Sequence, residues 1–247
     1  MTLRLTSRYL FVFLLAVLVF TELHELSHLS VLGLVCGSFG PRDFNQWQAG
    51  PSCAHPALSY LYSAAGPLFS YLMMWLGAAA LASPDPKRRA VGFSLLFANL
   101  PFARLFTALM GGGDELTIVR TLWADSPHFV LYKVLMILLV AALSGLPLWR
   151  AYRRIRNPRR WLWLLGFALG PMLFEFGYLF RALNGLLHAG VLPQPWALGT
   201  PAFIWLHTAL CAALLLLFRR NLLLVDAEAA PATPRIAQAA ATPSVVG

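Results

Sequence analysis

The hydrophobic and polar positions of this chain form long apolar runs joined by short polar or basic connections. Each run approaches the roughly 20 residues that a helix needs to cross the hydrocarbon core of a bilayer. Gly111-Gly112-Gly113 ends the third run, because successive glycines break a helix. The pattern predicts an all-α, polytopic membrane helix bundle with about six transmembrane helices. The expected spans are residues 9–35, 57–82, 91–110, 129–149, 161–183 and 201–218.

The composition agrees with a membrane protein. Hydrophobic residues make up 59% of the 247 residues and charged residues only 12%, which excludes an ordinary soluble domain. The formal net charge of +9 could indicate nucleic acid, but the basic residues lie in short connections, where they act as a topology signal. We therefore expect residues 1–225 to form one domain in the lipid bilayer, with no nucleic-acid partner. Residues 226–247 are rich in Ala, Pro and Thr and are predicted to be a disordered cytoplasmic tail.

The basic residues also predict an orientation in the membrane. One set of connections holds only Arg42 and Arg120. The opposite set holds Arg4, Arg8, Lys87, Arg88, Arg89, Arg150, Arg153, Arg154, Arg156, Arg159, Arg160, Arg219, Arg220 and Arg235. The positive-inside rule then places both termini in the cytoplasm, in a bacterial inner membrane.

His24-Glu25-Leu26-Ser27-His28 is an H-E-x-x-H motif inside the first apolar run. Ionisable residues in a span are paired, metal-bound or in a wet cavity, because isolated charge in hydrocarbon costs several kcal/mol. On a helix the two histidines lie one turn apart on one face. There they can bind one Zn²⁺, with Glu25 as the base toward the metal-bound water. The alternative is a helix whose histidines pair with Glu22 or Glu25, but so many ionisable groups in one span favour a metal site.

A catalytic zinc ion usually has three protein ligands and one open position. His24 lies roughly 20 Å into a hydrocarbon core about 30 Å thick, which puts the site in the extracytoplasmic half. Asp114 follows the outer end of the third span, and the glycine break before it lets the backbone turn its carboxylate into the bundle. Asp114 is therefore the expected third ligand, with the zinc site between the first and third spans.

Other residues remain alternatives for the third ligand. They are Glu115, Glu175, His55 and His128. Glu115 is the neighbouring fallback, and Glu175 could instead pair with Arg104 inside the bundle. The two histidines flank spans on the outer side, where an interfacial position is the commoner role.

The residues of the first three spans resemble the site-2 protease family of intramembrane zinc metallopeptidases. The matching elements are the motif at residues 24–28, Gly66-Pro67-Leu68-Phe69-Ser70 and Asp114, within about residues 9–115. The resemblance implies a zinc-bound water that cleaves membrane proteins within or beside their transmembrane helices. Two departures stand out: Ser70 occupies a place where the family commonly has asparagine, and Asp114 lies between Gly113 and Glu115 rather than before a glycine.

We expect an intramembrane zinc metalloendopeptidase with one Zn²⁺ held by His24, His28 and Asp114, and with Glu25 as the catalytic base. Its partner is then a transmembrane protein substrate. The main alternative is a non-proteolytic zinc-binding membrane protein of the same fold, with a binding or chaperone-like role. A transporter that uses the ionisable residues as a relay is a third hypothesis. Glu25 favours the enzyme, because a purely structural zinc ion needs no base beside its ligands.

Cysteine and glycine residues give further expectations about packing. Cys36 and Cys53 flank the first outer loop, where they either form a disulfide or remain two small apolar residues at span ends. Gly66-Pro67 predicts a kink in the second span. Gly166 and Gly170 form a G-x-x-x-G pattern, which is typical of close helix packing.

Overall fold

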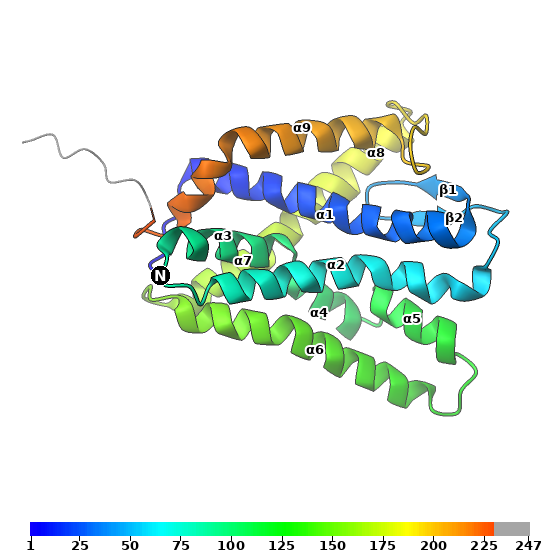
Figure 1. Ribbon diagram of the computed structural model, residues 1–247, viewed down its shortest axis with the longest axis horizontal. Coiled ribbons are helices and arrows are strands. Elements are labelled where there is room, and N and C mark those ends of the chain that lie inside the picture. Colours follow the sequence, from blue (N-terminus) through cyan, green and yellow to red (C-terminus); the bar gives the residue numbers. More distant parts are fainter. Residues whose placement is uncertain (230–247) are drawn as a thin grey trace, which may run out of the picture.

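The computed structural model describes residues 1–229. Long helices lie roughly side by side along the length of the molecule, and a small β-hairpin lies near one end (Figure 1). The elements are α1 (Ser7–Cys36), β1 (Phe39–Arg42), β2 (Trp47–Ala49), the 3₁₀ helix η1 (Pro56–Leu58), α2 (Ser59–Ala80), α3 (Pro86–Ala98), α4 (Pro101–Leu109), α5 (Asp114–Trp123), α6 (Phe129–Arg154), α7 (Arg160–Glu175), the π-helix η2 (Phe176–Leu183), α8 (Asn184–His188), α9 (Ala202–Phe218) and the 3₁₀ helix η3 (Arg219–Val225).

Five helical segments within residues 1–229 are long and apolar enough to cross a membrane, which indicates a multi-pass membrane protein. They are α1, α3 with α4 (Pro86–Leu109), α6, α7 with η2 and α8 (Arg160–His188), and α9 with η3 (Ala202–Val225). The helix α2, expected as a span over residues 57–82, is continuous for 22 residues and packs against α1 and α3. Serine, glycine, proline and tyrosine residues interrupt its apolar run. The polytopic helical bundle is thus confirmed, and a sixth span stays a prediction.

The third span is broken in the middle, where the sequence predicted one helix over residues 91–110. Leu100 has a left-handed backbone, with φ of 53° and ψ of 53°. Pro101 follows as the first residue of α4, a position that suits proline because its missing N–H would have no helical partner there. Asn99 steadies the break by donating from its side-chain amide to the Leu95 carbonyl oxygen at 2.7 Å. The break gives α4 a direction of its own (Figure 1).

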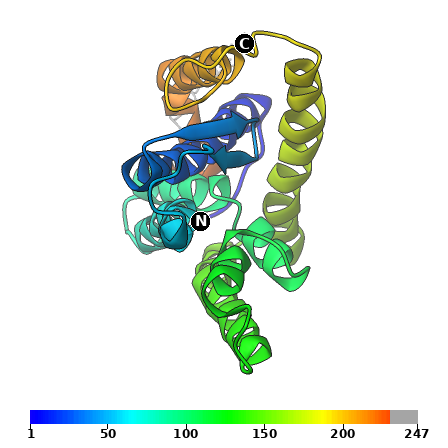
Figure 2. The same ribbon diagram turned by 90° about the vertical axis from the view of Figure 1, so that its right-hand side faces the viewer.

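Helix α1 lies at the centre of the bundle, in contact with α2, α3, α7 and α9. Figure 2 shows α7 and its continuation as a column standing apart from the α1–α2–α3 layer. Near the N-terminal end, five aromatic rings from α1, α3 and α7 pack in stacked, tilted and edge-to-face pairs, with centroids 4.7–6.1 Å apart. These rings are Tyr9, Phe13, Phe93, Phe97 and Phe167. Inside a bilayer the apolar lipid tails remove the hydrophobic driving force between helices, so helix association depends on close packing of this kind.

Glycines allow close contact between α2 and α3, but not at the pattern expected from the sequence. A Cβ on Gly77 would lie 2.7 Å from the Gly92 carbonyl oxygen, and one on Gly92 would lie 2.7 Å from the Gly77 carbonyl oxygen. Small residues let helix backbones approach in this way. A Cβ on Gly166 or Gly170 would meet nothing within 4 Å. The prediction of close packing at that G-x-x-x-G pattern is therefore wrong.

The β-hairpin and a disulfide cover one end of α1. Strand β1 pairs antiparallel with β2, and Cys36 is bonded to Cys53 across the hairpin, with a Cα–Cα distance of 4.1 Å. Of the two alternatives that the sequence left open, a disulfide or two unpaired cysteines, the structure shows the disulfide. Cross-linking the ends of this loop restricts its freedom in the unfolded chain.

A buried ion pair fastens the hairpin to α1. Arg42 of β1 donates from Nη2 to both carboxylate oxygens of Glu22, at 2.7 and 2.8 Å. Its Nη1 donates to Thr200 Oγ1 at 2.6 Å. All three residues are buried. The hairpin, α1 and the segment before α9 therefore meet at one polar contact, in which Arg42 Nε is the one guanidinium nitrogen without a hydrogen-bond partner within residues 1–229.

The two ends of the described chain lie against each other. Leu3 and Asp226 form an isolated antiparallel bridge, and the Ala227 amide donates to the Thr2 carbonyl oxygen at 3.0 Å. Residues 226–229 thus contact the N-terminus. The rest of the expected tail, residues 230–247, lies outside the described residues.

Candidate metal centre

His24, His28 and Asp114 form a group that could hold a metal ion. The Nε2 atoms of the two histidines are 3.1 Å apart. Asp114 Oδ2 lies 3.3 Å from His24 Nε2 and 3.5 Å from His28 Nε2. Three ligand atoms that share one tetrahedral Zn²⁺ at about 2.0–2.2 Å are about 3.3–3.6 Å apart. The two histidine–aspartate distances lie in this range and the distance between the histidine nitrogens is slightly shorter, so the group could hold one tetrahedral metal ion such as Zn²⁺.

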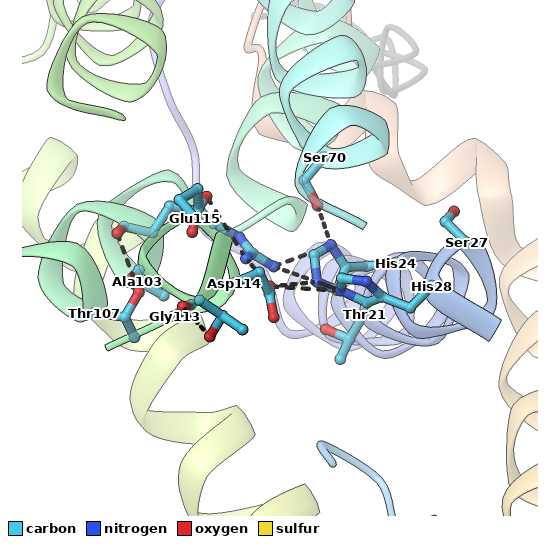
Figure 3. Close-up of polar contacts among 12 residues, drawn as sticks. Thr21, His24, Ser27, His28, Ser70, Ala103, Thr107, Gly113, Asp114 and Glu115 are labelled. Atoms are coloured by element: carbon cyan, nitrogen blue, oxygen red, sulfur yellow. Dashed lines mark hydrogen bonds and ion pairs between the residues drawn. The ribbon is translucent and has the colours of Figure 1, made fainter. Parts of the chain in front are cut away.

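The two imidazoles are held so that Nε2 of each points toward Asp114 (Figure 3). His28 Nδ1 lies 2.6 Å from the Tyr62 carbonyl oxygen, which can only accept, so Nδ1 carries a proton and Nε2 is the atom that a metal ion would bind. His24 Nδ1 lies 3.0 Å from Ser70 Oγ. Metal-binding histidines are commonly oriented by such a bond to the other ring nitrogen. Ser70 can therefore orient the His24 imidazole from the position at which the site-2 protease pattern commonly has asparagine.

Gly66 of α2 makes room for both imidazoles. A Cβ on Gly66 would lie 2.3 Å from His28 Nε2 and 2.6 Å from His24 Cε1. Real Cβ contacts do not come that close, so any larger residue would push the rings out of position. The sequence indicated only a kink at Gly66-Pro67, whereas the helix continues through Pro67. The glycine is required by its contact with α1, which sequence reasoning missed.

Asp114 reaches the histidines because a glycine turn precedes it. Gly111 and Gly113 have φ of +80° and +83°, values that suit glycine because it lacks a Cβ. Asp114 then becomes the first residue of α5. Burial alone would raise the pKa of Asp114, but hydrogen bonding with His24 and His28 and the charge of Arg104 hold it well below its usual value. The carboxylate is thus ionised, as a metal ligand must be.

The other residues considered as a third ligand lie elsewhere. Glu115 turns away from the histidines and accepts a hydrogen bond from the Tyr71 hydroxyl at 2.7 Å. Glu175 accepts from Thr21 Oγ1 at 2.7 Å. Within residues 1–229, the only metal-capable group of histidine, cysteine and acidic residues is His24, His28 and Asp114, without His55 and His128.

Arg104 of α4 is a second cation at this centre. Its Nη1 donates to Asp114 Oδ2 at 2.8 Å and lies 3.9 Å from Glu115 Oε1. The expected pair between Arg104 and Glu175 is not formed, because the break at Leu100 and the glycine turn carry Arg104 toward Asp114 instead. The sequence shows that Arg104 is charged, but not which of several carboxylates it meets.

Arg104 also contacts the first histidine. Its Nη2 lies 2.7 Å from His24 Nε2 and 3.0 Å from His24 Nδ1, and a guanidinium can only donate to these nitrogens. A metal ion would use the same lone pair. Metal binding therefore requires the guanidinium to leave His24, while its bond to Asp114 can remain.

Glu25 lines a cavity of about 590 Å³ between α1, α4 and α7, together with His24, Asp114 and Arg104. The opposite wall is apolar, with Phe106, Phe176 and Phe180. Phe176 and Phe180 belong to the π-helix η2, a form of helix that is frequent at functional sites. The open side of the three ligand atoms thus has a chamber large enough for more than a water molecule.

Two further groups complete the surroundings of the centre. The side-chain oxygen of Asn99, Oδ1, is buried without a hydrogen-bond partner within residues 1–229, and the residue lines the same cavity. Trp47 of the hairpin covers His28, with ring centroids 5.0 Å apart. Trp47 was not singled out by its sequence pattern, because it acts through a contact between distant segments.

No family model matches the chain, and no curated protein and no solved structure matches it significantly.

Proposed function

We propose that this protein is an intramembrane zinc metalloendopeptidase of the site-2 protease type, which hydrolyses peptide bonds in or next to transmembrane segments. The carrying observation is the group of His24, His28 and Asp114, whose ligand atoms lie 3.1–3.5 Å apart beside Glu25 in a cavity. Two imidazoles and one carboxylate with an open fourth position are typical of catalytic zinc. A structural zinc site is normally closed by four protein ligands.

The chemistry follows from the residues around the centre. Zinc held by the three ligands would lower the pKa of a bound water toward about 7 and polarise the substrate carbonyl. Glu25 accepts the proton of the attacking water and passes it to the leaving amine, so that one water is consumed and one C–N bond is broken. Ser70 Oγ and the Tyr62 carbonyl oxygen hold the two imidazoles in position through their Nδ1 atoms. Arg104 balances the negative charge of Asp114 and Glu115.

The cavity supports an apolar substrate. Its aromatic wall suits the side chains of a transmembrane segment, while the unpartnered side-chain oxygen Oδ1 of Asn99 can accept a hydrogen bond from a backbone N–H. A helical backbone already uses its N–H and C=O groups, so the substrate must unwind before its peptide bond can be attacked. We further propose that both termini face the cytoplasm and that the site lies in the extracytoplasmic half of the membrane.

One observation favours a second candidate, a non-proteolytic membrane protein of the same fold. The contact of Arg104 with His24 Nε2 occupies the lone pair that zinc would use. A protein that kept this contact would have a buried polar cluster and no turnover. A transporter would need broken helices in two matching halves. Within residues 1–229, the one residue with a left-handed backbone inside an expected span is Leu100.

The deciding experiment measures metal content and cleavage in the same preparation. The purified full chain should contain about one zinc ion and cleave one or more members of a panel of reconstituted single-span substrates. Glu25→Gln should keep the zinc and lower turnover by about 10²–10⁴-fold, because the amide cannot accept a proton. Asp125→Asn, an exposed change of the same kind, is the control. Full turnover by Glu25→Gln, or wild-type protein that binds no zinc, would overturn the proposal.

A further inference from the structure

A second cavity, of about 540 Å³, lies at the other end of the bundle from the β-hairpin. It is formed where α2 ends, where α3 begins and where α6 ends, beside the N-terminus (Figure 1). One wall consists of small apolar residues at the end of α2, including Ala79 and Ala82, whose short side chains leave the space open. The rest is lined by Arg89, Arg150, Arg153, Arg154, Arg156 and Glu228.

Most of the positive charge around this basic cavity has no acidic partner. Arg89 is paired with Asp226 at 3.2 Å and with Glu228 at 2.5 Å. The other four arginines form no ion pair within residues 1–229, and residues 230–247 contain no aspartate or glutamate. The Met1 ammonium group also lies here and donates to the Arg154 carbonyl oxygen at 2.9 Å. Several guanidinium groups around one concave space favour an anion, above all a phosphate.

Aromatic residues place this cavity at the level of lipid headgroups. Trp149 is 56% exposed on α6, one residue before Arg150. The Arg150 guanidinium lies 4.9 Å from the centroid of the Trp75 ring. Arg160 lies 4.2 Å from the centroid of the Tyr152 ring. Tryptophan and tyrosine gather at the boundary between hydrocarbon and water in membrane proteins.

The apolar surface next to the cavity continues along α6. Leu138, Leu139 and Leu146 are each at least half exposed on this helix, which runs from the cavity along the edge of the bundle (Figure 1). A molecule with a phosphate at one end and acyl chains at the other would match the cavity and this surface together. A soluble phosphate compound would use the arginines alone.

We propose that the basic cavity binds the headgroup of an anionic phospholipid. The phosphodiester lies among Arg150, Arg153 and Arg154, and the acyl chains lie along the exposed leucines of α6. Basic pockets between transmembrane helices bind anionic headgroups in this way. The cavity is distinct from the metal centre, so its ligand does not depend on the proposed peptidase activity.

The test compares two sets of variants of the full chain, purified in a neutral detergent. The first is Arg150→Gln with Arg153→Gln and Arg154→Gln. The second is Arg8→Gln with Arg219→Gln and Arg220→Gln, which removes the same charge from exposed arginines outside the cavity. Native mass spectrometry measures retained phosphatidylglycerol against phosphatidylcholine. We expect phosphatidylglycerol to bind the wild type and the control variant, and to bind the cavity variant about tenfold more weakly or worse.

Two further arms remove the remaining explanations. Ala82→Phe keeps every charge but fills the cavity, so it should also weaken phosphatidylglycerol binding, and it serves if the triple variant fails to fold. Inorganic phosphate and glycerol 1-phosphate are added to the wild type as soluble competitors. Equal retention by the cavity and control variants, full retention by Ala82→Phe, or equal binding of phosphatidylcholine would each overturn the proposal. Binding of inorganic phosphate as tightly as phosphatidylglycerol would overturn the lipid as its source.

Discussion

Two arginines, Arg42 and Arg104, join other elements to α1, and only Arg104 borders a cavity. Arg42 of the hairpin is matched by both oxygens of Glu22 and by the Thr200 hydroxyl. Arg104 of α4 donates to Asp114 and to His24, and it lines the cavity of about 590 Å³. The first contact is closed on all sides, whereas the second is open toward a space that can hold a ligand.

The comparison separates two glutamates that look alike in the sequence. Glu22 and Glu25 lie three residues apart on α1. The carboxylate of Glu22 is neutralised by a bidentate guanidinium, while Glu25 forms no side-chain hydrogen bond with any residue of the described chain and lines the cavity. A carboxylate held by a guanidinium contributes to structure, and a carboxylate without a hydrogen bond beside possible metal ligands is available for chemistry.

The largest effect should come from Gly66→Ala, which disrupts the metal centre without replacing a charged residue. The new Cβ would lie 2.3 Å from His28 Nε2, so the two imidazoles can no longer face Asp114 together. We expect loss of zinc from the purified protein, measured by elemental analysis, and loss of any cleavage. Gly166→Ala is the matched control, because its Cβ meets nothing within 4 Å. Normal zinc content in Gly66→Ala would show that the metal lies elsewhere.

Asp114→Asn should weaken zinc binding by about 100-fold or more, because a charged ligand is lost. Glu115→Gln should weaken it much less, since Glu115 acts only through Tyr71 and Arg104. Competition with a zinc chelator measures both affinities. A greater loss in Glu115→Gln would contradict the assignment of the third ligand.

Glu22→Gln should destabilise the fold by about 3–5 kcal/mol, because it leaves the Arg42 guanidinium buried without its counter-ion. The double variant Glu22→Leu with Arg42→Met should recover much of that stability, since replacing a whole buried pair by apolar residues is often neutral. Unfolding in detergent measures both. The folded fraction of Glu22→Gln should keep its zinc. Loss of zinc without loss of stability would instead show that Glu22 belongs to the metal centre.

The smallest effect concerns Arg104→Gln. Because Arg104 donates to the lone pair of His24 that zinc would use, its removal should tighten zinc binding by about tenfold, the equivalent of one charge-assisted hydrogen bond. Chelator competition is again the measurement, with Arg88→Gln, a change at an exposed residue of α3, as the control. Weaker zinc binding would mean that Arg104 chiefly orients Asp114, and the contrast with Arg42 would then be smaller than we infer.

The features that the sequence predicted well are those that depend on local periodicity. Apolar runs indicated the helices because spanning length is a property of one segment. The spacing of His24 and His28 placed them on one helical face because an α-helix has 3.6 residues per turn. The glycines before Asp114 indicated a turn because only glycine readily takes a positive φ. These inferences need no knowledge of neighbouring helices.

The tertiary structure alone decided which distant groups meet. Gly66 is needed because α2 crosses the two imidazoles, and Arg104 pairs with Asp114 rather than Glu175 because the third span breaks at Leu100. The disulfide depends in the same way on where the hairpin returns. Such contacts are set by the depth and rotation of one helix against another, which arise from packing over whole surfaces. The sequence by itself determined the types of the candidate ligands and the helical face of the two histidines. The packing of α1, α2 and α4 decided which residues surround the metal centre.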